Sequence, residues 1–116
     1  SAMVEGKTEH GFAFKYEAEK LNDWELLEDL VAVDGGDGSR LVSVLHRLLD
    51  DTQAAALKDF CRDENGRVPR DVMVREIYSI IRGGEKDGDG KNELLARMVS
   101  ACEGELICDF AEVYNI

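Results

Sequence analysis

Apolar residues recur at three- and four-residue intervals over most of this chain, and this spacing constrains the fold more than any other feature. They stand in five stretches that glycine, aspartate and asparagine turns separate. A stripe of this period lies on one face of a helix, and that face has to be buried against a neighbour. The pattern therefore predicts a mainly α-helical protein, a compact bundle of about five helices.

Polar residues predict where the helices begin. Asn22 and Glu25 have the spacing of a capping box, in which each side chain bonds the other residue's backbone N–H. We therefore expect the first helix to begin at Asp23, with Trp24 in its apolar stripe, and to end at the glycine-rich turn 34–38.

Similar signals delimit the helices that follow. Ser39 can cap the second helix, and Asp50 or Asp51 starts the third, which carries Phe60 on its apolar side. The Asn-Gly turn within residues 63–66 ends the third helix. Pro69 fits the first turn of the fourth helix, and Gly83 and Gly84 end it.

One short segment has a different period. Phe12, Phe14 and Tyr16 alternate with polar or small residues, which is typical of a half-buried strand. No second segment of this quality occurs, so the strand has to pair with a short extended segment, lie on helices or pair with another chain. An exposed strand edge is a template for association, which makes Phe12 and Phe14 candidate partner-binding residues.

The chain divides into four parts on these patterns. Residues 1–10 are polar, and we expect a tag remnant followed by a flexible N-terminus. Residues 11–82 hold the strand and four helices of one helical domain. Residues 83–91 (GGEKDGDGK) have the composition of a linker in which nothing packs, and residues 92–116 form a C-terminal amphipathic helix.

The charge excludes several classes of partner. The chain has 25 acidic and 14 basic residues, a formal net charge of −11, and no cluster of four or more basic residues. Nucleic acids and anionic membranes bind Lys/Arg patches, so we expect neither as a partner, whereas a basic protein is compatible with this surface. No signal peptide or membrane span is indicated, and three irregularly spaced cysteines suit reduced thiols in a cytosol.

The motifs that could hold a metal do not complete a site. Asp87 and Asp89 resemble the start of a calcium loop, but Lys91, Asn92 and Met98 stand where an EF-hand requires a ligand, a glycine and a glutamate. The sequence therefore predicts a solvated linker here, with no metal and no cofactor.

The residues that could be nucleophiles or bases also lack the neighbours they need. His46 lies at the edge of a helical stripe, and His10 lies in the expected flexible N-terminus, without a local nucleophile or acid. Cys61, Cys102 and Cys108 lie on or beside apolar faces, where filling the core is the expected role. We therefore expect no catalytic site, and an interaction role rather than an enzyme.

Three runs carry a resemblance to a known family. They are LNDWELLE (21–28), the helix LLDDTQAAALK (48–58) and RDENGRVP (62–69), in this order after an aromatic strand. Together they resemble the small tail assembly chaperones of long-tailed bacteriophages, over about residues 11–82. The segment from Leu94 to Ile116, especially ELICDFAEVY (105–114), resembles the start of a second protein that is often encoded downstream in phages of Gram-positive hosts.

The resemblance implies a mainly helical, self-associating protein in the cytoplasm of the bacterial host. Its partners are the tape-measure protein, which it shields during tail morphogenesis, and possibly the tail-tube protein. The C-terminal segment offers spaced apolar residues for such a contact, although the same face can instead pack on the first four helices. These candidate partner-binding residues are Leu95, Met98, Val99, Cys102 and Leu106.

Two other functions remain open on the sequence. A small acidic helical regulator or decoy would offer carboxylates to a basic protein, and its binding would weaken with salt. An enzyme with a dispersed active site would need a pocket with strongly perturbed titratable groups.

Overall fold

The protein is described here by a computed structural model, which covers residues 2–85. In chain order the elements are β1 (Met3–Lys7), β2 (Ala13–Glu17), the 3-10 helix η1 (Ala18–Leu21), α1 (Trp24–Asp34), α2 (Arg40–Leu48), α3 (Asp51–Cys61) and α4 (Arg70–Ile81). The expected mainly α fold with an N-terminal strand is confirmed in outline, with four α-helices in this part of the chain. The expected fifth helix, over residues 92–116, lies outside the described residues.

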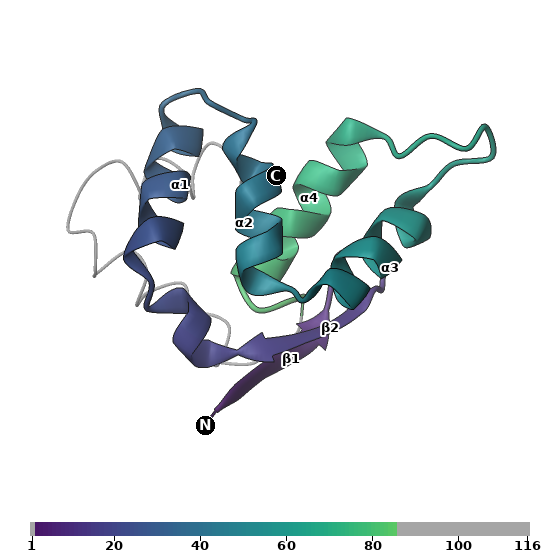
Figure 1. Ribbon diagram of the computed structural model, residues 1–116. Helices are drawn as coiled ribbons and strands as arrows, with labels where there is room; N and C mark the ends of the chain where they lie inside the picture. The colour runs from purple at the N-terminus through teal and green to yellow at the C-terminus, as the bar shows by residue number, and fades with distance from the viewer. Residues whose placement is uncertain (1, 86–116) are drawn as a thin grey trace.

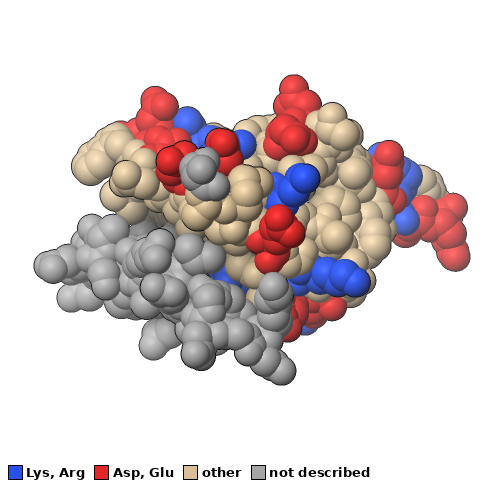
Figure 2. All heavy atoms as spheres, turned by 90° about the horizontal axis from the view of Figure 1, so that it is seen from below, with Lys and Arg blue, Asp and Glu red and all other residues tan. Residues whose placement is uncertain are grey.

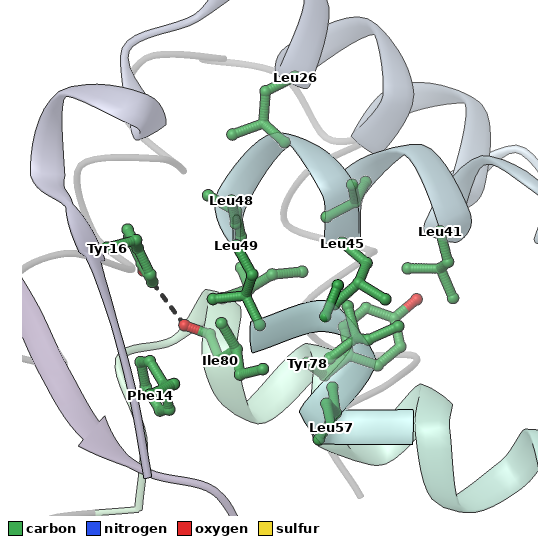
Figure 3. Packing of buried hydrophobic residues seen from close by; sticks show 14 of the residues in the cluster. Phe14, Tyr16, Leu26, Leu41, Leu45, Leu48, Leu49, Leu57, Tyr78 and Ile80 are labelled. Atoms are coloured by element: carbon green, nitrogen blue, oxygen red, sulfur yellow. Dashed lines mark hydrogen bonds between the residues drawn. The ribbon is translucent and has the colours of Figure 1, made fainter. Parts of the chain in front are cut away.

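The helices surround one apolar core, and the two strands lie across one end of it (Figure 1). Figure 3 shows Leu45, Leu48 and Leu49 directed from α2 and its end toward the side chains of α3 and α4. Tyr16 reaches into the same core from β2, where its hydroxyl donates to the carbonyl oxygen of Ile80 at 3.2 Å. The core therefore joins elements from both ends of the described chain.

The predicted flexible N-terminus is wrong from Met3 onward. Residues 3–7 form β1, which pairs antiparallel with β2, and Val4 stands opposite Tyr16. The first of the three alternatives for the strand, pairing with a short extended segment, is therefore the one found. The sequence gives little indication of β1 because Val4 is the one buried residue of this strand. Pairing with β2 and contact with α4 hold the strand in position.

Both outer edges of this hairpin are engaged within the chain. At β2, the Lys15 N–H donates to Gln53 Oε1 of α3 and the Lys15 carbonyl accepts from Gln53 Nε2, each at 2.9 Å. At β1, the Lys7 carbonyl accepts from the N–H of Glu85 at 2.8 Å. These contacts occupy three of the backbone groups that an added strand would use, which reduces the support for edge-to-edge association.

The hairpin and the end of α4 approach so closely that only glycine fits between them. A Cβ built on Gly6 would lie 2.7 Å from the Gly83 carbonyl oxygen, and one on Gly84 would lie 2.9 Å from that of Lys7. The prediction that nothing in residues 83–91 packs is therefore wrong for residues 83–85, where both glycines are buried. Residues 86–91 lie outside the described residues.

A buried carboxylate fixes the hairpin loop to α4. Glu76 is fully buried, and its two oxygens accept from the Thr8 hydroxyl and from the backbone N–H of His10, the latter at 3.2 Å. The Nδ1 atom of His10 lies 2.7 Å from Glu76 Oε2. One turn further along α4, Ser79 Oγ accepts from the N–H of Glu9 at 3.0 Å. His10 is thus held in the fold, and the expectation that it lies in a flexible segment is wrong.

The N-terminal cap residues of α1, α2 and α3 lie within one residue of the predicted positions, but the bonds that they make differ in part from those predicted. The N-cap of α1 is Asp23, whose side chain accepts from the Glu25 N–H, so the predicted capping box at Asn22 is wrong. Asp50 caps α3 by accepting from the Gln53 N–H, as predicted. Ser39 stands at the start of α2 but makes no side-chain capping bond.

Helix α1 buries a different face from the one expected. Its buried apolar residues are Leu26, Leu30 and Val33, while Trp24 is 71% exposed. Buried Asp29 shares this inner face, where it accepts from Arg40 Nε and Arg47 Nε of the α2 segment, each at 2.8 Å. Burial raises the pKa of Asp29, but hydrogen bonds from Ser43, Arg47 and Arg40 outweigh it and hold the pKa below its usual value.

We predict that Gly84→Ala destabilises the fold far more than Gly36→Ala. Both glycines have positive φ, so both substitutions carry strain of ~1 kcal/mol, but only Gly84 has backbone atoms within 4 Å of the added Cβ. Urea unfolding should show an additional loss of ~1–3 kcal/mol for Gly84→Ala, as in overpacked cores. Equal losses for the two variants would contradict the close packing of β1 on α4.

We predict that Asp29→Asn lowers stability at pH 7 by ~2 kcal/mol, because charge-assisted hydrogen bonds to α2 are lost. Since the folded pKa of Asp29 is depressed, its contribution is present above the unfolded pKa and is lost as pH falls through the folded pKa. The difference from the native protein should therefore shrink toward pH 2–3 in thermal or urea unfolding. Asp59→Asn, which removes an exposed pair with Arg62, is the control and should cost under ~1 kcal/mol.

Candidate functional site

An apolar groove lies between α2 and α4, with a volume of about 740 Å³. The two helices are close at their C-terminal ends and separate toward their N-terminal ends (Figure 1). The groove lies where they separate, because its lining comes from the first part of α2, the first two turns of α4 and the residues that precede each helix, together with Lys58 of α3. Its apolar lining consists of Leu41, Val42, Leu45, Val68, Met73, Val74 and Ile77.

The sequence places apolar side chains on both walls at helical spacing. Leu41 and Leu45 are one turn apart on α2, and Met73 and Ile77 are one turn apart on α4. Val42 lies at the outer edge and is 63% exposed, whereas Leu41 and Leu45 form the buried floor. Residues Arg70 to Ile77 extend ~10 Å along α4, so the groove has the length of about two turns of a docked helix.

The titratable side chains among the described residues that line the groove are all basic. His46, Lys58 and Arg70 stand among its lining residues, and no aspartate or glutamate of the described chain does. Lys58 and Arg70 form no ion pair within residues 2–85, while His46 lies 3.8 Å from exposed Asp51. The basic character of this lining contrasts with the net charge of −11 of the whole chain. It suits a ligand that is apolar on one face and acidic at its margins.

Two other hollows are smaller. One of about 470 Å³ lies on α1 beside exposed Trp24 and includes both Glu28 and Arg40. The other, of about 520 Å³, lies against the hairpin and Glu85. Neither combines a continuous apolar lining with charges of one sign, so the groove between α2 and α4 is the better candidate for a binding site.

The groups with perturbed acid–base properties lie elsewhere. A clearly shifted pKa is found for Tyr16, Asp29, Arg47, Cys61 and Arg75, and none of these five residues lines the groove. Over the same residues, no three His, Cys, Asp or Glu side chains gather as a metal site would require. The described lining of the groove is therefore mainly an apolar surface, and the five shifted groups lie outside it.

The structure places the candidate partner-binding residues in three different situations. Phe14 is only 4% exposed and packs in the core, so the expectation that it meets a partner is wrong, because the apolar face of β2 is covered by α4 and the helices. Phe12 is half-buried, and its ring centroid lies 5.4 Å from that of exposed Phe60. The other candidates, Leu95, Met98, Val99, Cys102 and Leu106, lie outside the described residues.

The sequence alone does not predict the groove between α2 and α4. Leu41, Leu45 and Ile77 belong to the helical stripes of the second and fourth helices, and periodicity alone does not tell which apolar residues border an opening. His46 was expected at the helix surface beside an apolar stripe, and it is found there, at the edge of the groove. The sequence also did not indicate that no acidic residue within 2–85 lines the groove, because the lining comes from three separate segments of the chain.

A scan against protein-family models, a search of curated proteins and a search of solved structures each returned no match for this chain. None of the helices described in residues 2–85 has the length and apolar character needed to cross a membrane.

We predict that Cys61 is unreactive in the folded protein. Burial, together with the negative charge of nearby Glu76, raises the pKa of Cys61 to about 11. The thiolate is the reactive form, so at pH 8 only about one thiol in a thousand is poised to react. In a Cys102→Ser/Cys108→Ser variant, iodoacetamide labelling followed by mass spectrometry should be at least ~100-fold faster in urea than in buffer. Similar rates in both conditions would contradict the burial of this thiol.

Proposed function

We propose that the chain is a non-catalytic tail assembly chaperone, which binds and shields the tape-measure protein during tail morphogenesis in the cytoplasm of the bacterial host. The groove between α2 and α4 is the proposed contact site. Its occupant is an amphipathic helical segment of the tape-measure protein whose apolar face is flanked by acidic residues.

The observation that carries this proposal is the lining of the groove, which is apolar with basic residues at its margins. Helix-in-groove recognition uses apolar anchors at spacings of three and four residues, and both walls present their residues at the same spacing. The family resemblance supplies the identity of the partner, because tail assembly chaperones bind a long helical protein.

Homo-oligomer formation and contact with the tail-tube protein also belong to the proposal. They rest on the resemblance alone, since both edges of the hairpin are already engaged within the chain. Light scattering of the purified chain measures the oligomer size directly.

The alternative, an acidic decoy for a basic protein, finds less support on the surface. On the face shown in Figure 2, acidic side chains are scattered and interspersed with basic ones rather than gathered into one patch. A decoy needs a continuous acidic area, because single exposed carboxylates bind weakly and are screened by salt.

The test is co-expression of the full chain with the tape-measure protein of the same phage. We expect the soluble fraction of the tape-measure protein to rise several-fold, and the complex to survive 1 M salt because burial of apolar surface holds it. Val42→Asp should abolish both effects, since it places a charge at the exposed edge of the groove. Ala55→Asp, an equal change of charge at an exposed position of α3, should leave them unchanged.

Two results would contradict the proposal. One is the absence of any gain in solubility or of any complex with the unmodified chain. The other is a complex that dissociates in salt and responds equally to both substitutions, which would favour the acidic decoy.

A further inference from the structure

We infer that the groove between α2 and α4 is occupied by the chain's own segment 92–106 when no partner is bound. The segment would dock as an amphipathic helix, and a partner would have to displace it. This inference goes beyond the proposed function and does not require it, because it concerns the same groove but only this chain.

The apolar spacing of the segment matches the groove. Leu95, Val99, Cys102 and Leu106 follow one another at intervals of four, three and four residues, the pattern that a helix presents to an apolar groove. Met98 lies on the same face, three residues after Leu95 and four before Cys102. The walls of the groove repeat at one helical turn, and their length accepts about two turns. The segment can therefore present two or three anchors at once.

The charges of the two surfaces are complementary. The docking segment, residues 92–106, contains three acidic residues and one arginine, a net charge of −2. The groove carries Lys58 and Arg70, which make no ion pair within residues 2–85, and no acidic residue of that range lines it. Since the whole chain is acidic, a basic groove is the favoured place for an acidic segment, and attachment to the same chain raises its effective concentration.

The chain is long enough for this contact. The described residues end at Glu85, next to Lys7 and beyond the C-terminal end of α4. From there to the first turn of α4 is roughly the length of that helix, ~18 Å. Residues 86–94 can span up to ~30 Å when extended, so Leu95 can reach the groove without any change in the described fold.

The experiment is a cross-link within the full chain. Val42→Cys places a thiol at the exposed edge of the groove, and Cys108→Ser leaves native Cys102 as its partner on the segment. Buried Cys61 does not compete, because its thiol is protonated at the pH of the reaction. We expect mild oxidation at micromolar concentration to give a monomeric species with a bond between position 42 and Cys102, at least ten-fold more than from Glu28→Cys at an exposed position of α1.

Matched substitutions in the segment test the docking face. Met98→Asp should reduce the cross-link at least ten-fold, because it places a charge on the apolar face. Ser100→Asp adds the same charge on the opposite face of a helix and should leave the yield within two-fold. Mass spectrometry of the proteolysed products measures both yields.

Three results would overturn the inference. They are a yield no higher than that of Glu28→Cys, equal effects of Met98→Asp and Ser100→Asp, and cross-links between chains rather than within one, which would assign the groove to a second copy. None of these outcomes depends on the tape-measure protein. If the cross-link forms and co-expression still shows no complex, the proposed function alone fails.

Discussion

The attachment of the hairpin loop to α4 through Glu76 is the contact on which the rest of the structure depends. A two-stranded hairpin is marginal by itself in water, so β1 and β2 need a surface to hold them. Glu76 provides it by accepting hydrogen bonds from Thr8 and His10, while Gly84 lets the backbone of β1 approach α4. Burying the Glu76 carboxylate without these donors would lower the free energy of unfolding by several kcal/mol. The helix therefore requires the loop for its buried carboxylate, and the loop requires the helix to hold it.

This attachment also explains where the groove lies. The hairpin packs on the C-terminal half of α4, from Glu76 to the glycines that follow it, and α2 closes against the same end through Leu48 and Leu49. The hairpin does not pack between the first turns of α2 and α4, and these turns lie apart. The opening between them leaves Val42 exposed and Met73 and Val74 half-buried, so that apolar side chains are accessible to a docked helix.

The sequence predicted the helical elements well and their inner faces less well. The caps at Asp23 and Asp50 depend on neighbours three residues away or fewer, so local signals place α1 and α3 to within a residue. The buried face of α1 was misjudged, because Leu26, Leu27, Leu30, Val31 and Val33 make the helix apolar almost all round. Contact with α2, where two arginines bind Asp29, decides which side faces inward and leaves Trp24 exposed.

By itself, the sequence determined the number and limits of helices α1 to α4, because periodicity, caps and turn glycines act over a few residues. Only the tertiary structure decided that Met3–Lys7 is a strand, that Phe14 belongs to the core, and that the groove between α2 and α4 is basic. Each depends on residues between ten and seventy positions apart, such as Thr8 with Glu76 or Lys58 with His46. Such contacts do not produce a periodic pattern in the sequence, since they stabilise the fold only when distant segments pack together.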